Sequence, residues 1–461
     1  MIDTLMSVED GLSLGRGEIR ENYKKYVNPG FASMLAMLDF DKHFVKAQGT
    51  KVWDENGNEY LDFLGGYGSL NLGHNHPKII EALDKVTGVP VLLQASLSKL
   101  APTLGFNLAQ LTPGELKNCF FANSGAEAVE GALKLSRAAT GRQRLVYCDG
   151  GFHGKTMGAL SVSGRKKYRD PFKPLVPETL EVPFGDGEAL ELAIRDQEAA
   201  AFLVEPVQGE GGIIFPPEGY LAKAQELCNR YGTLLILDEI QSGFGRTGYM
   251  FACETEGVEP DVMCLSKFLG GGIMPVGAFI TTETIWNAAF GGMEKCLLHT
   301  STYGGNTWGM AAGIAALKTA VEEDLPRQAQ EKGDYLLDKL QEISSGSQLI
   351  KEVRGKGLLI GLEFSPLSEG TLQKISGGMV NKLGQEYLGS ITAGELLNRH
   401  GIITAYTLNN PNVIRLEPPL NVSYEELDRV LEALQETLDK RLGGLLFSTG
   451  KAAISNIFRR K

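Results

Sequence analysis

The sequence predicts an α/β fold with a large domain built on a mostly parallel sheet and a smaller α+β domain. Six short apolar runs alternate with helical stretches between residues 75 and 325, as is typical of strands buried on both faces of a sheet. These runs are CFFANSG, RLVYCDG, AAFLVEPVQ, TLLILDEI, DVMCLSK and GAFITT. Beyond residue 330 the chain begins again with a charged helix, which is followed by a strand, a helix, a strand and a final helix. This order indicates the smaller α+β domain.

Three parts of the chain follow from this pattern. Residues 1–74 are expected to form an N-terminal segment that contributes to the small domain, 75–330 the large domain and 331–461 the C-terminal small domain. In the last part, VRGKGLLIGLEF and NVIRLEPPL read as one strand each, and SYEELDRVLEALQETLDKRL as the final helix. The tail FSTGKAAISNIFRRK is either a frayed terminus, which we favour, or a weak surface anchor.

Turn signals organise the N-terminal segment. The Asn56-Gly57 turn lies between two strand-like runs and predicts a hairpin. Before it, a helical stretch is expected to end around YVNPGF, because Asn28-Pro29-Gly30 is a turn signal.

The composition argues against several classes of protein. The chain has 461 residues, of which 43% are hydrophobic and 22% charged, as in ordinary soluble proteins with a sizeable core. A net charge of -11 disfavours nucleic acid as the main partner. No stretch approaches the roughly 20 apolar residues that span a bilayer, and the N-terminus lacks signal-peptide order. The six cysteines are scattered without CxxC pairs, so we expect reduced thiols, no metal site and a cytoplasmic protein.

The run LLILDEIQSGFGRTG carries the first candidate residues. Leu234–Leu237 form an apolar strand that delivers Asp238 to its carboxyl end, the edge at which ligands bind in open α/β sheets. An ionised carboxylate there needs a cationic or hydrogen-bonding partner. Asp238 is therefore either a ligand-binding group or a cap of the next turn. Gln241 follows in a loop whose glycines permit close approach of the backbone to a ligand.

The run FFANSGAEAVEGALKLSR predicts a strand, a turn and an amphipathic helix. Free N–H groups and the helix dipole at Ser124, Gly125 and Ala126 suit an anion, with the Ser124 hydroxyl as a further donor. Plain helix capping by Ser124 is the alternative.

In CDGGFHGKTMGALS the letters GKT resemble the end of a Walker loop, but the preceding glycine is wrongly spaced. What remains is an aromatic pair, Phe152 and His153, at a strand-to-loop junction. A flat ring at this position either stacks on a flat ligand or packs in the core.

The run DVMCLSKFLGGG places Lys267 directly after an apolar strand. A lysine in apolar surroundings has a lowered pKa, which supplies the neutral amine that an imine-forming nucleophile needs. The alternative is a lysine that extends to water. Gly270–Gly272 would let the loop pass close to a cofactor. Combined with the anion-binding turn, the aromatic pair and Asp238, this lysine predicts a site for a phosphate-bearing aromatic aldehyde.

These motifs together resemble the class III aminotransferases of fold type I, which depend on pyridoxal 5′-phosphate (PLP). LILDEIQSGFGRTG, CLSKFLGGGIMPVGAF, NSGAEAVEGALKLSR, GFHGKT, VEPVQGEGG and HTSTYGGN occur in the order that the family shows, and the resemblance extends from about residue 26 to 440. VNPGF, VPFG, RGKG, TLNN and IRLEPPL are most similar to the branch that acts on putrescine. The resemblance implies that the large domain binds PLP.

The resemblance also implies a role for each candidate residue. Lys267 would form the internal aldimine with PLP and move the proton between substrate Cα and C4′, and Asp238 would keep the pyridine nitrogen protonated. Gln241 would approach the ring hydroxyl and Phe152 would stack on the ring. The other implied cofactor residues are Ser124, Gly125 and Ala126 at the phosphate, His153 beside Phe152, and Thr302, which would reach the phosphate from a partner subunit.

Two further residues concern the substrate. Arg415 is similar to the arginine that binds a substrate α-carboxylate through a bidentate pair, although by itself it would read as an outward residue on an edge strand. Glu205 is similar to the glutamate that neutralises this arginine when the donor has no carboxylate. Lys155 replaces an arginine that binds the distal carboxylate in some members, which argues against a strict 4-aminobutyrate or acetylornithine role. Thr307 replaces the usual proline after GGN.

We therefore expect a PLP-dependent ω-aminotransferase that moves the terminal amino group of a putrescine-like diamine to 2-oxoglutarate by a ping-pong reaction, as in polyamine degradation. The resemblance implies a homodimer, or a dimer of dimers, with shared active sites. An ω-amino-acid or amine:pyruvate transaminase, or an ornithine or 4-aminobutyrate type, remains open. From another class, a non-catalytic PLP-fold protein is the alternative, against which the intact Lys267 and Asp238 weigh.

Overall fold

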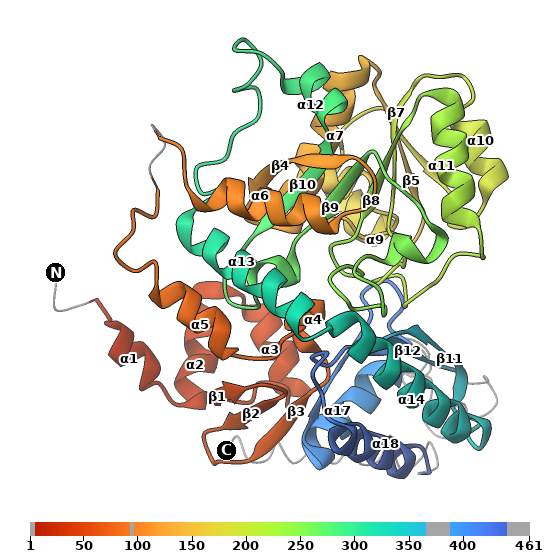
Figure 1. Ribbon diagram of the computed structural model, residues 1–461. Coiled ribbons are helices and arrows are strands. Elements are labelled where there is room, and N and C mark those ends of the chain that lie inside the picture. The colour runs from red at the N-terminus through yellow and green to blue at the C-terminus, as the bar shows by residue number, and fades with distance from the viewer. Residues whose placement is uncertain (1–4, 93–95, 366–387, 440–461) are drawn as a thin grey trace.

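The strands that the structure describes form one large and two smaller sheets (Figure 1). The computed structural model describes residues 5–92, 96–365 and 388–439. The large sheet has seven strands in the order β4-β10-β9-β8-β7-β5-β6. Its strands are β4 (Leu116–Ala122), β5 (Arg144–Cys148), β6 (Thr179–Val182), β7 (Ala199–Val204), β8 (Leu234–Asp238), β9 (Val262–Leu265) and β10 (Gly277–Thr282).

All strands of this sheet except β10 run in the same direction. β6, β5, β7, β8 and β9 pair in parallel, and β10 is antiparallel to both β9 and β4. The predicted mostly parallel sheet is confirmed, and the carboxyl ends of six strands meet at one edge. β6 was not predicted from the sequence, because this edge strand is only partly buried and has no continuous apolar run.

Helices cover both faces of the large sheet, which explains the continuous apolar runs. Leu235 and Leu237 belong to a cluster that includes α10 (Gly187–Ile194) and α11 (Tyr220–Tyr231). Ile236, between them, points to the other face and joins a cluster with α7 (Gly125–Thr140) and α12 (Glu283–Phe290). Because successive side chains of a strand alternate between faces, a strand covered on both sides needs apolar residues at every position.

The N-terminal segment forms a small sheet that a C-terminal strand completes. β1 (Phe44–Gln48), β2 (Lys51–Asp54) and β3 (Glu59–Asp62) are antiparallel, with the predicted turn between β2 and β3. β13 (Ile402–Ile403) adds in parallel to β3. Chain segments more than 300 residues apart therefore share one sheet, at the bottom of Figure 1.

The helical stretch before this sheet does not end at Asn28. It runs through α1 (Val8–Leu12), α2 (Arg16–Asn22) and a π-helical turn (Tyr23–Val27), and then restarts as α3 (Pro29–Met37). The Asn28 side chain caps α3, and the following proline occupies its first turn, where its missing N–H costs nothing. The predicted turn signal is therefore a helix start.

The C-terminal part forms a second four-stranded sheet in the order β11-β12-β15-β14. The run predicted as a single strand, VRGKGLLIGLEF, is an antiparallel hairpin of β11 and β12 that turns at Gly357, whose φ is 53°. A side chain there would collide with the backbone of Arg246–Gly248. The elements are β11 (Ile350–Lys356), β12 (Leu359–Phe364), β14 (Ala405–Tyr406), β15 (Val413–Leu416), α17 (Leu388–His400) and α18 (Tyr424–Leu438).

Two consecutive helices, α13 (Thr307–Glu322) and α14 (Leu325–Ser345), run from the large sheet to the C-terminal sheet (Figure 1). The remaining α-helices among the described residues are α4 (Gly65–Gly68), α5 (Pro77–Asp84), α6 (Leu100–Leu111), α8 (Met157–Ser161) and α9 (Lys166–Arg169). None of the helices that the structure describes is long and apolar enough to cross a membrane. The tail that the sequence analysis singled out lies outside the described residues.

Candidate active site

Five strand ends at one edge of the large sheet carry the predicted site residues. This clustering follows from the shared direction of the strands, and it brings together residues up to 143 positions apart in the chain. The candidates, in the order of the strands, are Ser124–Ala126 after β4, Lys267 after β9, Asp238 at the end of β8, Glu205 after β7 and Phe152–His153 after β5.

Asp238 and His153 form a buried pair. His153 Nδ1 lies 2.7 Å from Asp238 Oδ2, and the Ile240 N–H donates to Asp238 Oδ1 at 3.2 Å. Burial by itself lowers the pKa of His153, but the hydrogen bond and charge of Asp238 outweigh it, so the pKa of His153 is raised. The imidazole thus compensates the carboxylate that the strand end buries. His153 is a partner of Asp238, a contact that the sequence did not predict.

Glu205 is a second buried carboxyl group beside this pair. It accepts hydrogen bonds from the N–H groups of Phe152 at 2.8 Å and Gly209 at 3.1 Å. Burial raises the pKa of Glu205 to about 7, although the charge of His153 acts in the opposite direction. These bonds orient the loop that presents the partly buried ring of Phe152.

The structure corrects the pairing predicted for Glu205. The carboxylate that pairs with Arg415 is Glu210, at 2.7 Å from Arg415 Nη2. Glu205 follows β7 immediately and turns onto the loop after β5, whereas Glu210 lies five residues further on. The sequence VEPVQGEGG offers both glutamates, and only the course of the loop distinguishes them.

Lys267 lies in a short turn directly after β9. Its φ of 49° is a left-handed conformation that residues other than glycine rarely adopt. Burial lowers the pKa of Lys267 against the opposing charges of Glu417 and Glu210. Among the described residues, Nζ of Lys267 forms no hydrogen bond or salt bridge. The lysine therefore has the environment of a neutral amine.

The turn before α7 fits an anion. Ser124 caps this helix by accepting a hydrogen bond from the Glu127 N–H at 3.2 Å, so the capping alternative is correct for its hydroxyl. The N–H groups of the first helical turn have no partner within the helix and carry the positive end of its dipole. Gly277 of β10 packs against this turn, where a side chain would collide with the Ser124 carbonyl oxygen.

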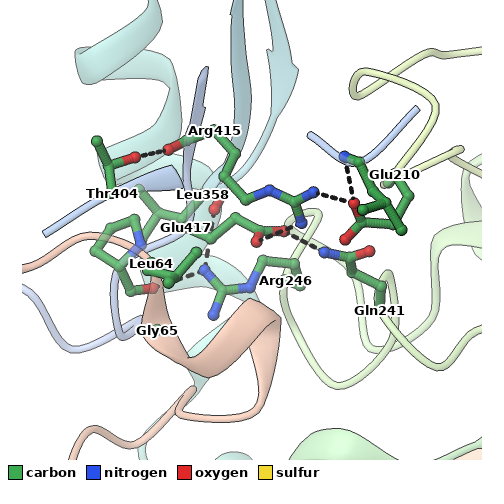
Figure 2. A network of polar contacts seen from close by, with 12 residues as sticks. Leu64, Gly65, Glu210, Gln241, Arg246, Leu358, Thr404, Arg415 and Glu417 are labelled. Atoms are coloured by element: carbon green, nitrogen blue, oxygen red, sulfur yellow. Dashed lines mark hydrogen bonds and ion pairs between the residues drawn. The ribbon is translucent and has the colours of Figure 1, made fainter. Parts of the chain in front are cut away.

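Figure 2 shows a buried network of polar contacts around Arg415, a residue of the C-terminal sheet. The Arg415 side chain is 0% exposed on β15, which lies between β12 and β14, so the outward edge-strand alternative is wrong. Its Nη1 lies 3.3 Å from Glu417 Oε2, and Gln241 Nε2 donates to Glu417 Oε1 at 2.7 Å. The hydrogen bond to Glu417 thus fixes the position of the Gln241 side chain.

Three residues around Arg415 were not predicted from the sequence: Glu210, Glu417 and Tyr67. The Tyr67 ring centroid lies 5.2 Å from the Arg415 guanidinium carbon. The strand period was a usable signal for Glu417, because residues two apart on a strand point to the same face. No comparable signal marks Tyr67, which lies in α4, shortly after β3.

Thr302 is exposed on the 291–306 segment. The Ser301 hydroxyl next to it accepts a hydrogen bond from Asn123 Nδ2 at 3.1 Å, beside the anion-binding turn. The contact of Thr302 with a partner subunit remains a prediction.

The replacement of proline by Thr307 has a physical basis. Thr307 begins α13, and its hydroxyl donates to the Pro90 carbonyl at 2.7 Å while its N–H donates to that of Val91 at 3.2 Å. Proline would lose both bonds. Thr307 therefore fastens the 90–91 segment to the start of α13.

The fold and this cluster define a PLP-dependent transaminase, and comparison with known proteins gives the family. The model of the family described as "Aminotransferase class-III" matches residues 38–438 of this chain. The chain belongs to the class III aminotransferases, which confirms the predicted fold type, enzyme class and cofactor and weighs against a non-catalytic protein.

Solved structures of related enzymes are similar over most of the chain. Ornithine aminotransferase from Toxoplasma gondii ME49 is 31% identical, with a TM-score of 0.82 over 94% of this chain and 97% of that one. Acetylornithine aminotransferase from Elizabethkingia anophelis is 29% identical, with a TM-score of 0.75 over 92% and 99%. A PLP-bound amine transaminase from an uncultivated Pseudomonas species is 29% identical, with a TM-score of 0.76 over 86% and 94%.

The donor set at the strand ends fits PLP. A buried carboxylate, Asp238, matches a ring nitrogen, and a lysine with a lowered pKa, Lys267, matches an aldehyde. The free N–H groups at the start of α7 match a phosphate. Each group lies at a strand end of the same sheet edge.

The raised pKa of Glu205 predicts that the stability of the folded protein depends on pH. The folded protein holds a proton on Glu205 up to about pH 7, whereas an unfolded chain releases it near its usual 4.5. Between these values the folded state binds more protons, so this carboxyl group stabilises less as the pH rises. We expect the thermal midpoint of the wild type, relative to that of Glu205→Gln, to fall between about pH 5 and about pH 8. A constant difference between the two proteins across this range would contradict the prediction.

Proposed function

We propose that this transaminase takes the terminal amino group of a diamine, putrescine or a close analogue, and transfers it to 2-oxoglutarate. The observation that carries the proposal is the buried pair of Arg415 and Glu210 beside Lys267. A site that neutralises its own carboxylate-binding arginine accepts an amine whose reacting carbon bears no carboxylate. When Glu210 leaves the arginine, the same site accepts a 2-oxo acid.

PLP, when bound, supplies the aldehyde that takes up the amino group and a ring that withdraws electrons from the reacting carbon. Asp238, held by His153, places a negative charge at the ring nitrogen and keeps it protonated. Lys267, whose pKa burial lowers, would take the proton from the reacting carbon and deliver it to C4′, the carbon that carries the aldehyde of PLP.

The remaining candidate residues orient the two reactants. With PLP bound, Phe152 would stack on its ring, and Gln241, which donates a hydrogen bond to Glu417, would lie near the ring hydroxyl. The N–H groups that follow Ser124 bind the phosphate. Arg415 takes the 2-oxo-acid carboxylate after Glu210 turns away; Glu210 is the more exposed partner, at 12% against 0% for Arg415.

A second subunit completes the site in this proposal, which assigns the enzyme to a cytoplasmic homodimer. Large apolar side chains are exposed on the 291–306 segment that contains Thr302: Met293, Leu297, Leu298 and Tyr303. Exposed apolar groups of this number support burial against a partner protein. Thr302 then reaches the phosphate of the other subunit.

Ornithine is the second candidate donor, because ornithine and acetylornithine aminotransferases are among the similar structures. Lys155 favours the diamine: a single ammonium binds a distal carboxylate less specifically than the planar guanidinium that other members have at this position.

Initial rates with 2-oxoglutarate across putrescine, cadaverine, ornithine and 4-aminobutyrate test the donor. We expect putrescine to give the highest kcat/KM, by about tenfold or more over 4-aminobutyrate, since Lys155 is a poor match for a carboxylate. Replacing 2-oxoglutarate with pyruvate is the control for the acceptor. A higher value with ornithine would assign the chain to that branch, and activity with pyruvate alone would refute the acceptor.

Lys267→Ala is expected to abolish turnover and leave the protein folded, because the lysine acts in the chemistry and its Nζ forms no hydrogen bond or salt bridge with the residues that the structure describes. Borohydride reduction followed by mass spectrometry should link PLP covalently to the wild type at residue 267 and not to the variant. Lys223→Ala, on the exposed side of α11, is the matched control and should keep both the linkage and the activity. Turnover by Lys267→Ala near the wild-type rate would refute the role.

Arg415→Ala is expected to slow the half-reaction with 2-oxoglutarate far more than the half-reaction with putrescine, by about a hundredfold or more. The arginine binds a carboxylate that only the first of these substrates presents. Rapid-mixing absorbance of the PLP chromophore measures the two half-reactions separately. Equal losses in both would mean that Arg415 is not the carboxylate-binding residue.

A further inference from the structure

Glu417 has no direct part in the reaction described above, yet it lies at the centre of the network in Figure 2. Its side chain is 0% exposed. One carboxylate oxygen lies 3.3 Å from Arg415 Nη1, and the other accepts the hydrogen bond from Gln241 at 2.7 Å. Both oxygens are therefore engaged, and the carboxylate is fixed in place.

The two carboxylates around Arg415 differ in what they can do. Glu210 is partly exposed and contacts Nη2, whereas Glu417 is fully buried and contacts Nη1. The Nε–H of Arg415 is buried and has no hydrogen-bond partner in the part of the chain that the structure describes. Nε and Nη2 form one edge of the planar guanidinium, the kind of edge that binds a carboxylate with two bonds. A substrate carboxylate therefore takes the edge that Glu210 leaves, and Glu417 keeps the other.

A fixed carboxylate changes the charge that the substrate meets. A second buried arginine, Arg246, lies nearby and donates hydrogen bonds to the carbonyl oxygens of Leu358 and Pro418 and to the Asn71 side chain. The negative charges of Glu417 and Asp62 oppose the lowering of the Arg246 pKa by burial. Whatever the position of Glu210, Glu417 makes this end of the site one unit less positive. A less positive site attracts a carboxylate more weakly and repels an incoming ammonium group less.

We propose that Glu417 is a specificity-determining residue: its fixed carboxylate offsets Arg415 in both half-reactions and so favours donors whose reacting carbon bears no carboxylate. This inference rests on the proposed function. Glu417 also acts on Lys267: among the charges that oppose the lowering of the Lys267 pKa by burial, that of Glu417 has the largest effect.

Glu417 additionally positions Gln241. A side chain at Gly209 would collide with Gln241 Oε1, so the loop after β7 leaves room for this glutamine in the orientation that Glu417 holds. Loss of the carboxylate is therefore also expected to change the absorbance of bound PLP, which reports on the groups around its ring.

Glu417→Gln preserves the shape of the side chain and removes its charge. The best substrates for the comparison are 4-aminobutyrate and L-glutamate, which differ only by the carboxylate on the reacting carbon; putrescine is the third. Rapid mixing with the holoenzyme gives the rate constant of each amine half-reaction. We expect the ratio of the terminal-amine rate constants to that of glutamate to fall about tenfold or more.

Two further variants serve as controls. Glu363→Gln makes the same change in a carboxylate that pairs with Arg354 at 2.6 Å elsewhere on the same sheet, and should leave the ratio unchanged. Glu417→Asp keeps the charge and should restore most of the wild-type ratio. A purely structural role would instead lower the rates with all three substrates together.

A ratio unchanged in Glu417→Gln would overturn the inference. Glu417→Ser removes the same charge while leaving room for water, and predicts the same fall, so the test does not depend on glutamine fitting the buried position. Failure of the wild type to react with putrescine, whatever its rate with 4-aminobutyrate, would sink the proposed function instead. A wild type that reacts with both, with an unchanged ratio in the two variants, would sink the role of Glu417 alone.

Discussion

The common direction of the strands in the large sheet is the constraint on which the site depends. Strands β4, β9, β8, β7 and β5 end at the same edge, and the residues that follow them are delivered to one place although they are far apart in the chain. A single reversed strand, β10, lies between β4 and β9, and it places Gly277 against the Ser124 turn. The spacing between that turn and Lys267 therefore depends on a glycine in a neighbouring strand.

Concentrating charged groups at this edge carries an electrostatic cost that the structure offsets with specific partners. Asp238 is compensated by His153, and Arg415 by two carboxylates. Lys267 differs from these because Nζ has no hydrogen bond or salt bridge among the described residues. The same burial that requires partners elsewhere thus lowers the pKa of Lys267, the group that we propose as the nucleophile.

Much of this arrangement could be predicted from the sequence, and the limits have identifiable causes. Asp238 and Lys267 were predictable because each directly follows an apolar strand, where the strand direction decides the position. Glu205 and Glu210 were not distinguishable, since a loop of five residues can turn either glutamate toward Arg415. The hairpin at Gly357 was read as one strand because the apolar run Leu358–Ile360 begins directly at its turn and conceals the reversal of the chain. Gln241 was predicted at the ring, but its dependence on Glu417 needed the three-dimensional structure.

The network around Arg415 also connects parts of the chain that belong to different sheets. Gln241 and Arg246 follow β8 of the large sheet, whereas Glu417 and Pro418 follow β15 of the C-terminal sheet. The carboxylate that we propose tunes donor choice is thus also a link between the two sheets. In the proposed function, exchange of donor and acceptor at Arg415 requires movement of Glu210, which lies on the loop after β7 and is partly exposed. Glu417 is buried and bonded on both oxygens, so the site can release one partner of its arginine while the contact between the two sheets remains intact.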